Sequence, residues 1–381
     1  MHADNQGHHA SGRRDDLRLS LNQLLFELSQ FGSSAVVAWR PSGKGLELVL
    51  LPKTRLLQMK DPIRRVFEGP RHLNDGEFKE VVNFVAVQPT EIRLDFPIGG
   101  SANGLSHDDV ESVMSRYSIG FVPFRTVFLI DVVGFSKHTP EEQASYLSTL
   151  QFCLSLAEAT LHRAGLPMEM GRSTTGDGYY VWNLQTGLNE DVSLCVLMTL
   201  FSLYYKSLQQ EMSEKMPLPE LRMALSGGSH YVFYEPSPKY VARHEYIVGD
   251  VTINVARLIG KARADQILVG DCVNRAEGPE PWTAHRYVVA ANKVLDGFRN
   301  LKVFGNQVEE SRFYLTGPRD EALFRNQKIK IVDKHGIEHI CYNAKVNTHM
   351  KDGSTVFSGL QHSDLRGGAK PGAGPEATGA I

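Results

Sequence analysis

The chain has 381 residues, of which 42% are hydrophobic and 22% are charged, and its formal net charge is −2 at pH 7. This length is enough for two or more domains of about 100–200 residues each, and the composition is ordinary for a soluble globular protein. A nearly neutral chain has no overall field that draws it to nucleic acid or to a membrane surface. We therefore expect neither of them as a partner.

Residues 1–16 are polar and contain no apolar stretch, which excludes a secretory signal peptide. The most apolar run, 194–205, is interrupted by Thr199 and Ser202 and is shorter than the roughly 20 residues that a membrane-spanning helix needs. These features predict a cytoplasmic protein. The four cysteines form no closely spaced pair, so neither a disulfide framework nor a zinc site is indicated: Cys153, Cys195, Cys272 and Cys341.

The N-terminal part predicts a disordered tail and then a small α/β module. Residues 1–16 show no periodicity and are expected to be disordered. Apolar residues then recur at helical spacing over 17–31, and two strand-like runs follow at 35–39 and 46–51. We assign this module to residues 17–117.

A second region, 118–317, predicts an α+β domain with a ferredoxin-like β-α-β-β-α-β order. Thr139-Pro140-Glu141-Glu142 has the residues of a capping box with Pro at the first helical position, so a helix begins there. The order of elements indicates an antiparallel sheet with helices on one face. The expected elements are a strand ending near 130, a helix from 140, a hairpin around 176–178, a helix at 191–212, a strand at 222–226 ended by two glycines, a helix at 251–262, and strands at 266–269, 301–304 and 312–316.

The C-terminal part predicts a β-rich extension over residues 318–362, with strand-like runs at 328–332, 338–342 and 355–358. Residues 363–381 are rich in Gly, Ala and Pro and are expected to form a disordered tail.

Two carboxylates stand out in the second region. Asp131 follows the apolar residues of a buried strand, and Asp177 sits in the turn Gly176-Asp177-Gly178. Each by itself fits a turn aspartate that bonds its own backbone. The strand order, however, can bring the two together, and like charges so close repel unless a cation lies between them. Oxygen ligands of this kind suit Mg²⁺ or Mn²⁺.

Four motifs in order make the region from about 121 to 316 resemble the class III nucleotidyl cyclases, the adenylate and guanylate cyclase family. Phe-Leu-Ile-Asp-Val-Val-Gly-Phe-Ser at 128–136 resembles the first metal motif, and Thr-Thr-Gly-Asp at 174–177 resembles the second. Arg-Met-Ala-Leu-Ser-Gly-Gly at 222–228 resembles a third motif, with Ala in place of its first Gly. Gly-Asp-Val-Thr-Ile-Asn-Val-Ala-Arg-Leu at 249–258 resembles the start of a helix that carries Asn and Arg.

The resemblance implies roles for individual residues. Asp131, Asp177 and the Val132 carbonyl would hold two divalent metal ions, Mn²⁺ or Mg²⁺. Asn254 and Arg257 would come from the partner protomer, where they orient the ribose and stabilise the transition state, so a homodimer with shared active sites is expected. The segment that would line the triphosphate is Val133, Gly134, Phe135 and Ser136.

Two positions depart from the family pattern. Asn254 and Arg257 are three residues apart, whereas the family places them four apart, one helical turn. Arg257 keeps its spacing from Gly249, so it is the better supported of the two. The family also has a lysine that binds the triphosphate, and both Lys302 and Lys293 are candidates for it.

The base-reading positions hold Ser173 and Tyr246, where adenylate cyclases have Lys and Asp and guanylate cyclases have Glu and Cys. Neither purine code is present, and the pattern resembles the bacterial pyrimidine cyclases of Pycsar antiphage defence. Tyr246 could narrow a base pocket, or it could be simply a strand aromatic, and Arg172 is a further candidate reader. The implied reaction is UTP to 3′,5′-cyclic UMP and pyrophosphate, with CTP or a purine nucleotide as the alternative substrate.

A different class of function stays open: a catalytically silent cyclase-like module that binds nucleotide or only dimerises. The altered spacing of Asn254 favours it, and the intact pair Asp131 and Asp177 opposes it. A P-loop or Rossmann nucleotide enzyme is disfavoured because the sequence has neither GxxxxGK[ST] nor GxGxxG. The flanking regions could sense a signal or complete the dimer.

Overall fold

A computed structural model describes residues 4–43, 45–56, 64–99, 103–212, 217–238, 245–275, 278–316 and 327–361. The chain divides into two compact units, one made of Met1–Pro123 and Ser229–Gly249, the other of Phe124–Gly228 and Asp250–Ile381. The module predicted over residues 17–117 therefore leaves out the segment 229–249, which belongs to the first unit although it lies far along the sequence. The expected tail at 363–381 lies outside the described residues.

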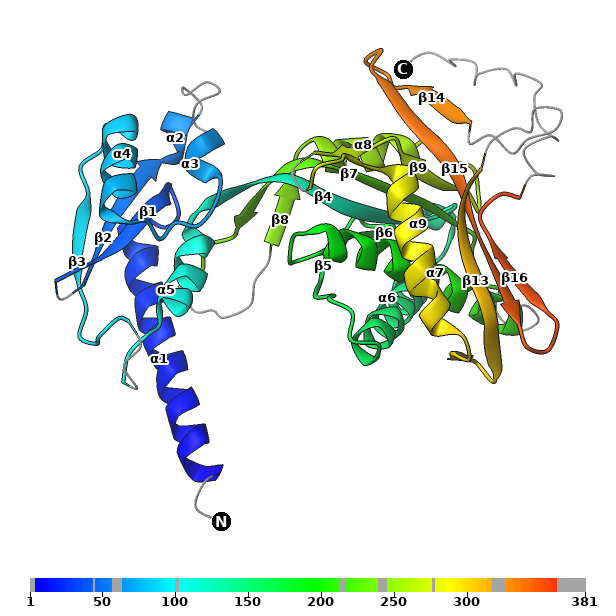
Figure 1. The fold of residues 1–381 in the computed structure, drawn as a ribbon, viewed down its shortest axis with the longest axis horizontal. Coiled ribbons are helices and arrows are strands. Elements are labelled where there is room, and N and C mark those ends of the chain that lie inside the picture. The colour runs from blue at the N-terminus through cyan, green and yellow to red at the C-terminus, as the bar shows by residue number, and fades with distance from the viewer. Residues whose placement is uncertain are drawn as a thin grey trace. The chain divides into compact units, whose positions relative to one another are not determined.

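The first unit is built on a three-stranded antiparallel sheet in the order β1-β2-β3 (Figure 1). The two expected strands are confirmed, and Ser42 pairs with Gly45 across the turn between them. Apolar side chains form separate clusters around Leu21 and Val36 and around Val37 and Phe78, so both faces of the sheet are buried. Its elements are α1 (Asp4–Leu28), β1 (Ser34–Ser42), β2 (Gly45–Pro52), α2 (Lys53–Leu56), α3 (Arg64–Phe67), α4 (Asp75–Val85), β3 (Thr90–Arg93), α5 (His107–Met114), η2 (Ser115–Tyr117) and β8 (Glu245–Val248).

The prediction of disorder over residues 1–16 is wrong for the part that is described, because α1 already begins at Asp4. The sequence signal was missing because apolar periodicity starts only at Leu17. Charged contacts extend the helix instead: Arg14 Nε donates to Asp109 Oδ2 at 2.6 Å, and Arg18 pairs with the other oxygen of the same carboxylate. Asp109 is 3% exposed, so this ion pair anchors the N-terminal half of the helix.

The second unit contains the predicted β-α-β-β-α-β order as β4-α6-β5-β6-α7-β7, and its strands lie in the order β7-β4-β6-β5 (Figure 1). The α+β fold class is confirmed. The elements of the unit are β4 (Ile119–Val132), η3 (Phe135–Lys137), α6 (Pro140–Arg163), β5 (Met170–Thr174), β6 (Gly178–Asn183), α7 (Leu188–Met212), β7 (Leu221–Tyr234), α8 (Asp250–Ile259), β9 (Ile267–Gly270), β10 (Val273–Asn274), β11 (Trp282–Thr283), α9 (Ala284–Leu295), η4 (Asp296–Phe298), β12 (Lys302–Val303), β13 (Asn306–Thr316), β14 (Lys328–Val332), β15 (Glu338–Met350) and β16 (Thr355–Ser358).

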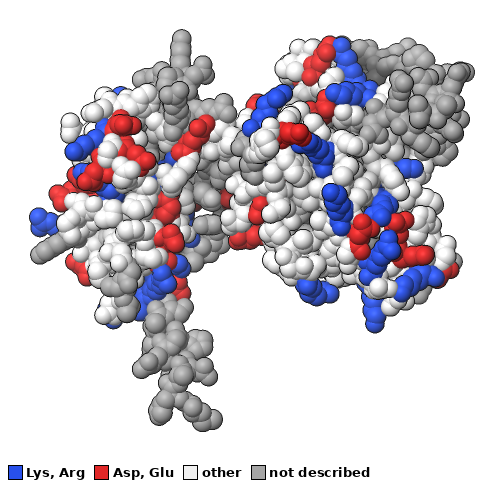
Figure 2. Space-filling model, viewed as in Figure 1, with Lys and Arg blue, Asp and Glu red and all other residues white. Residues whose placement is uncertain are grey.

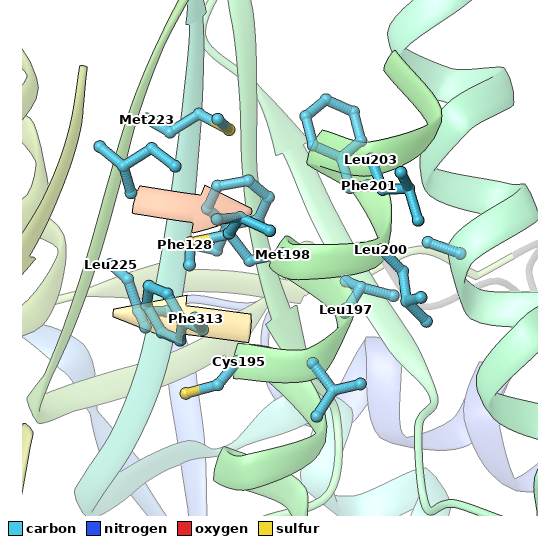
Figure 3. Packing of buried hydrophobic residues seen from close by; sticks show 14 of the residues in the cluster. Phe128, Cys195, Leu197, Met198, Leu200, Phe201, Leu203, Met223, Leu225 and Phe313 are labelled. Carbon is cyan, nitrogen blue, oxygen red and sulfur yellow. The ribbon is translucent and has the colours of Figure 1, made fainter. Parts of the chain in front are cut away.

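Helices α6, α7 and α9 pack on one face of this sheet and form its main core with it. Helix α6 begins as predicted, with the side chain of Thr139 accepting from the Glu142 backbone and Glu142 bonding back. Figure 3 shows α7 in this core, where Phe201 and its neighbours lie near Phe128 of β4 and Met223 of β7. Phe128 and Phe201 meet edge to face with ring centroids 5.7 Å apart.

Two expectations about the sheet are wrong. It is mixed rather than antiparallel, because β9 pairs with β7 in parallel, and the connection between them carries α8 on the face opposite α6 and α7 (Figure 1). Strand β7 also runs through Gly227 and Gly228 instead of ending there. A Cβ on Gly227 would lie 2.1 Å from Phe124 Cζ, so the glycine marks a close approach rather than a turn.

The C-terminal strands are not an appendage. Strand β15 pairs with β9 on one side and with β13 on the other, so residues 338–350 form an interior strand of the 11-stranded sheet (Figure 1). Strands β14 and β16 match the expected runs, and each pairs with β15. Helix α9 was missed by the sequence analysis, although Tyr287, Ala291 and Leu295 recur at helical spacing on its buried face.

Charges on the face seen in Figure 2 are intermingled rather than gathered by sign. One cluster of ion pairs joins two arginines to two carboxylates: Arg299, Arg312, Asp296 and Glu310. Within the described residues, none of the helices combines the length and the apolar character that crossing a bilayer requires.

A buried carboxylate in the second unit gives a stability prediction. Asp191, 3% exposed, accepts from the Thr126 backbone N–H at 2.7 Å, from the Thr126 hydroxyl at 2.8 Å and from the Tyr287 hydroxyl at 3.2 Å. Burial raises the pKa of Asp191 to about 6 even though these hydrogen bonds lower it. The pKa of Asp191 is higher in the folded than in the unfolded state, so this group stabilises the fold fully below about pH 4. Its contribution to the free energy of unfolding is lost as the pH rises through about 6, by roughly 3 kcal/mol in total.

Asp191→Asn is therefore expected to remove this part of the pH dependence, because an amide keeps an acceptor for Thr126 and gains a donor for Tyr287. Urea unfolding of both proteins at pH 4.5, 6 and 8 measures the effect. We expect the variant to gain stability relative to wild type between pH 4.5 and pH 8. An equal pH dependence in the two proteins would contradict the assignment.

Candidate active site

The two aspartates predicted to act together are neighbours in the second unit. Asp131 pairs in register with Gly178, the residue after Asp177, and the Val132 backbone N–H donates to the Asp177 carbonyl at 3.0 Å. This approach depends on glycine, because a Cβ on Gly178 would lie 1.9 Å from the Ile130 carbonyl oxygen. The hairpin thus places Asp177 directly beside the end of β4.

Asp131 also has a cationic partner that the sequence analysis did not identify. Arg222 on β7 donates from Nε to Asp131 Oδ2 at 2.7 Å, and a terminal nitrogen of the same guanidinium contacts that oxygen. Burial raises the pKa of Asp131, the Arg222 hydrogen bonds and charge oppose the rise, and the Asp177 carboxylate adds to it. Arg222 belongs to the third motif, so the motif itself was visible but its contact was not.

The residues fit a divalent metal site in part. The Asp177 carboxylate lies close enough to Asp131 to raise the pKa of Asp131, and with the carbonyl of the next residue, Val132, the two carboxylates form an oxygen donor set of the kind that Mg²⁺ and Mn²⁺ prefer. In the part of the chain that the structure describes, no group of three or more His, Cys, Asp or Glu side chains is placed to hold a metal ion. Asp131, Asp177 and the Val132 carbonyl would therefore hold the metal, together with oxygens of a bound substrate.

The segment after β4 offers fewer backbone donors than expected. The Val133 N–H is already donated to the Glu220 carbonyl at 2.9 Å, so it is not available to a phosphate. Gly134 has a left-handed backbone with φ 71° and begins the short helix η3. Gln143 of α6 holds the segment by donating to the carbonyls of Phe135 and His138. Of the predicted backbone donors to phosphate, those of residues 134–136 stay candidates.

The structure separates Ser173 and Arg172, two of the candidate base readers. Ser173 pairs with Tyr180, which pairs with Leu129, so Ser173 shares its sheet face with Asp131, two residues farther along β4. Arg172 points to the opposite face, the one that α6 and α7 cover. Arg172 thus lies on the other side of the sheet from Asp131 and α8, and its role as a base reader stays a prediction.

Tyr246, the third candidate reader, lies on β8 of the first unit and pairs with Phe233 of β7. The two rings are stacked, with centroids 5.3 Å apart and planes at 15°. Its hydroxyl donates to Glu235 at 3.3 Å, and the residue is 39% exposed. Tyr246 is thus an oriented, partly exposed aromatic side chain rather than a core residue.

Asn254 and Arg257 both lie on α8, where they flank the side that is buried through Val251 and Val255. Both contact one hairpin. Arg257 Nε forms an ion pair with Asp333 at 3.2 Å, and Asn254 Oδ1 lies 3.1 Å from His339 Nδ1. A separation of three residues still places two side chains on the same side of a helix.

The two candidate lysines are both exposed, Lys293 on α9 and Lys302 on β12. Strand β12 is separated from β4 by β13, β15, β9 and β7, so Lys302 lies at the far end of the sheet from Asp131. Within one chain, Lys302 is therefore distant from the carboxylates.

Comparison with protein-family models gives no match, and comparison with curated proteins gives none either. Among solved structures, the chain is similar to the guanylyl cyclase Cya2 (13% identity, 59% of this chain and 92% of that one, TM-score 0.36). It is similar to the adenylyl cyclase CyaB from P. aeruginosa (16%, 59% and 95%, TM-score 0.36). It is also similar to the guanylate cyclase domain of RhGC from Catenaria anguillulae in complex with GTP (13%, 58% and 97%, TM-score 0.33). Similarity at this level transfers neither a substrate nor an activity to this chain.

Proposed function

We propose that the protein is a metal-dependent nucleotidyl cyclase that converts UTP to 3′,5′-cyclic UMP and pyrophosphate. The observation that carries the proposal is the pair Asp131 and Asp177, held side by side by the pairing of β4 with β6. The four sequence motifs, found in their expected order, add to it. The product would act as a second messenger in the cytoplasm, in antiphage defence as the resemblance implies.

In the proposed reaction the ribose 3′-hydroxyl gives up its proton to solvent and its oxygen attacks the α-phosphorus, while the bond from the α-phosphorus to the bridging oxygen breaks and pyrophosphate leaves. Asp131 and Asp177 would hold the divalent ions, which when bound would supply charge stabilisation for the attacking and leaving oxygens. The N–H groups of residues 134–136 would contact the triphosphate. Arg257 and Asn254 are contributed by the partner protomer, where Arg257 stabilises the developing negative charge and Asn254 orients the ribose.

The choice of a pyrimidine rests on Tyr246 and Ser173. If Tyr246 lines the base site, as the resemblance implies, its large ring, stacked on Phe233, would leave less space for the base and favour one ring over two. The Ser173 hydroxyl can donate to the 4-carbonyl of uracil, and a buried donor left without a partner costs about 1–3 kcal/mol. With Arg172 on the opposite face of the sheet from Asp131, Ser173 is the better placed candidate of that pair for choosing UTP over CTP.

A nucleotide-binding or dimerisation module without turnover is the second candidate function. The ion pair between Arg222 and Asp131 favours it, because a carboxylate already paired with a guanidinium binds a metal cation less readily. This candidate predicts nucleotide binding without pyrophosphate release.

The test is kcat/KM for UTP, CTP, ATP and GTP with Mn²⁺, read as pyrophosphate release and as cyclic product. We expect UTP to be best, CTP second and both purines poor, and we expect Tyr246→Ala to relax the exclusion of purines. Phe357→Ala is a matched control, because Phe357 is an exposed aromatic residue on strand β16. Preference for ATP or GTP would contradict the pyrimidine proposal, and no release with any nucleotide would favour the silent module.

A further inference from the structure

The turn between β14 and β15 carries a carboxylate that is buried against α8. The Asp333 side chain is 5% exposed, and its Oδ1 accepts from the backbone N–H groups of His335 at 2.8 Å and Ile337 at 3.0 Å. Its other oxygen, Oδ2, faces Arg257 Nε at 3.2 Å and His339 Nε2 at 3.6 Å. Burying a carboxylate is costly unless it is paired, so the turn is built to keep this charge beside Arg257.

The second contact of the hairpin fixes the orientation of an amide. His339, which is 8% exposed, places Nδ1 3.1 Å from Asn254 Oδ1. An amide oxygen only accepts hydrogen bonds, so His339 donates from Nδ1. The Asn254 Oδ1 is then occupied, and its amide nitrogen is left to donate to another group.

In the proposed reaction, Arg257 acts through its terminal guanidinium nitrogens and Asn254 through its amide nitrogen, and neither contact with the hairpin uses these atoms. The contact at Arg257 Nε is an ion pair without a hydrogen bond. Asp333 engages Arg257 at Nε, which leaves the two terminal nitrogens of the guanidinium, and the side chain stays 34% exposed. A contact that blocked the residues would instead cover these terminal groups. We propose that Asp333 and His339 are positioning residues for the reaction, which hold Arg257 and Asn254 in the geometry they present to the partner protomer. The proposal rests on the proposed function, and it makes the hairpin a working part of the active site.

Asp333→Asn is the sharpest variant, because an amide keeps the acceptor for the two turn N–H groups and replaces only the oxygen that faces Arg257. Asp352→Asn is the matched control. Asp352 accepts from the Ser354 backbone N–H at 2.9 Å in the turn at the other end of β15, so it tests the same change in a similar turn without the contact to Arg257. His339→Leu and its control His349→Leu, on the exposed side of the same strand, test the Asn254 contact in the same way.

With the full-length protein, Mn²⁺ and the best nucleotide, we expect Asp333→Asn to lower kcat by about tenfold or more and to change KM by less than about threefold. Asp352→Asn should stay within about twofold of wild type. Asp333→Asn with kcat equal to that of the control would overturn the proposal. A rise in kcat would also overturn it, since the contact would then restrain Arg257 rather than position it.

A second measurement does not depend on activity. Urea unfolding of Asp333→Asn, Arg257→Met and the double variant forms a double-mutant cycle. We expect the change in the unfolding equilibrium constant of the double variant to be about threefold smaller than the product of the changes in the two single variants. Independent effects in this cycle would overturn the proposal. If wild-type protein turns over no nucleotide, the proposed function fails, and the cycle alone decides whether Asp333 holds Arg257.

Discussion

Asp131→Ala and Asp177→Ala are each expected to lower cyclic nucleotide production by about a thousandfold or more, while the second unit stays folded. Each change removes a charged oxygen ligand from a site where the Asp177 carboxylate adds to the burial that raises the pKa of Asp131. The measurement is pyrophosphate release with Mn²⁺, together with metal titration by calorimetry. Weaker Mn²⁺ binding should accompany the lost activity.

Asp131→Ala also leaves Arg222 without its carboxylate, a loss of stability that is separate from the loss of the metal ligand. Asp131→Asn is the companion variant, because its amide oxygen can still accept from Arg222 while the charge is gone. Asp352→Ala, an exposed turn carboxylate in the same unit, controls for the loss of a negative charge as such. Near-normal turnover in Asp131→Asn or Asp177→Ala, with an intact fold by circular dichroism, would contradict the two-metal site.

Local signals in the sequence predicted the local structure well. The capping box at Thr139 marks the start of α6, and the Gly-Asp-Gly turn marks the hairpin that carries Asp177. In both cases the residues that decide the structure are within a few positions of one another. The same holds for β14 and β16, whose apolar runs have the observed limits.

Contacts between distant residues could not be predicted in the same way. Arg222 meets Asp131 across 91 positions of the chain, and His339 meets Asn254 across 85. A single sequence specifies no partner for a surface arginine or a strand histidine, because many arrangements satisfy the same polar group. The interior place of β15 was missed for a similar reason, since its pairing with β9 depends on register and not on composition.

The closing prediction concerns assembly. If Asp131 and Asp177 act with Arg257 of a second chain, then a chain that lacks Asp131 and a chain that lacks Arg257 have complementary defects. In a head-to-tail dimer of the two, one site combines both defects and the other has neither. Random exchange makes half of the dimers mixed, and each of those has one intact site of two, so the mixture should recover about a quarter of wild-type activity.

The experiment mixes Asp131→Ala with Arg257→Ala after dissociation and reassembly, and subunit exchange is verified by mass spectrometry of isotopically labelled chains. Each variant alone should stay near background at every concentration, whereas the mixture should gain activity in proportion to the fraction of mixed dimers. A mixture of Asp131→Ala with Asp177→Ala is the matched control. Both of those defects lie on the metal side of the site, so every mixed dimer keeps one defect in each site and should stay inactive. Recovery in that control, or no recovery in the first mixture despite complete exchange, would show that the active site is not shared between chains in the proposed way.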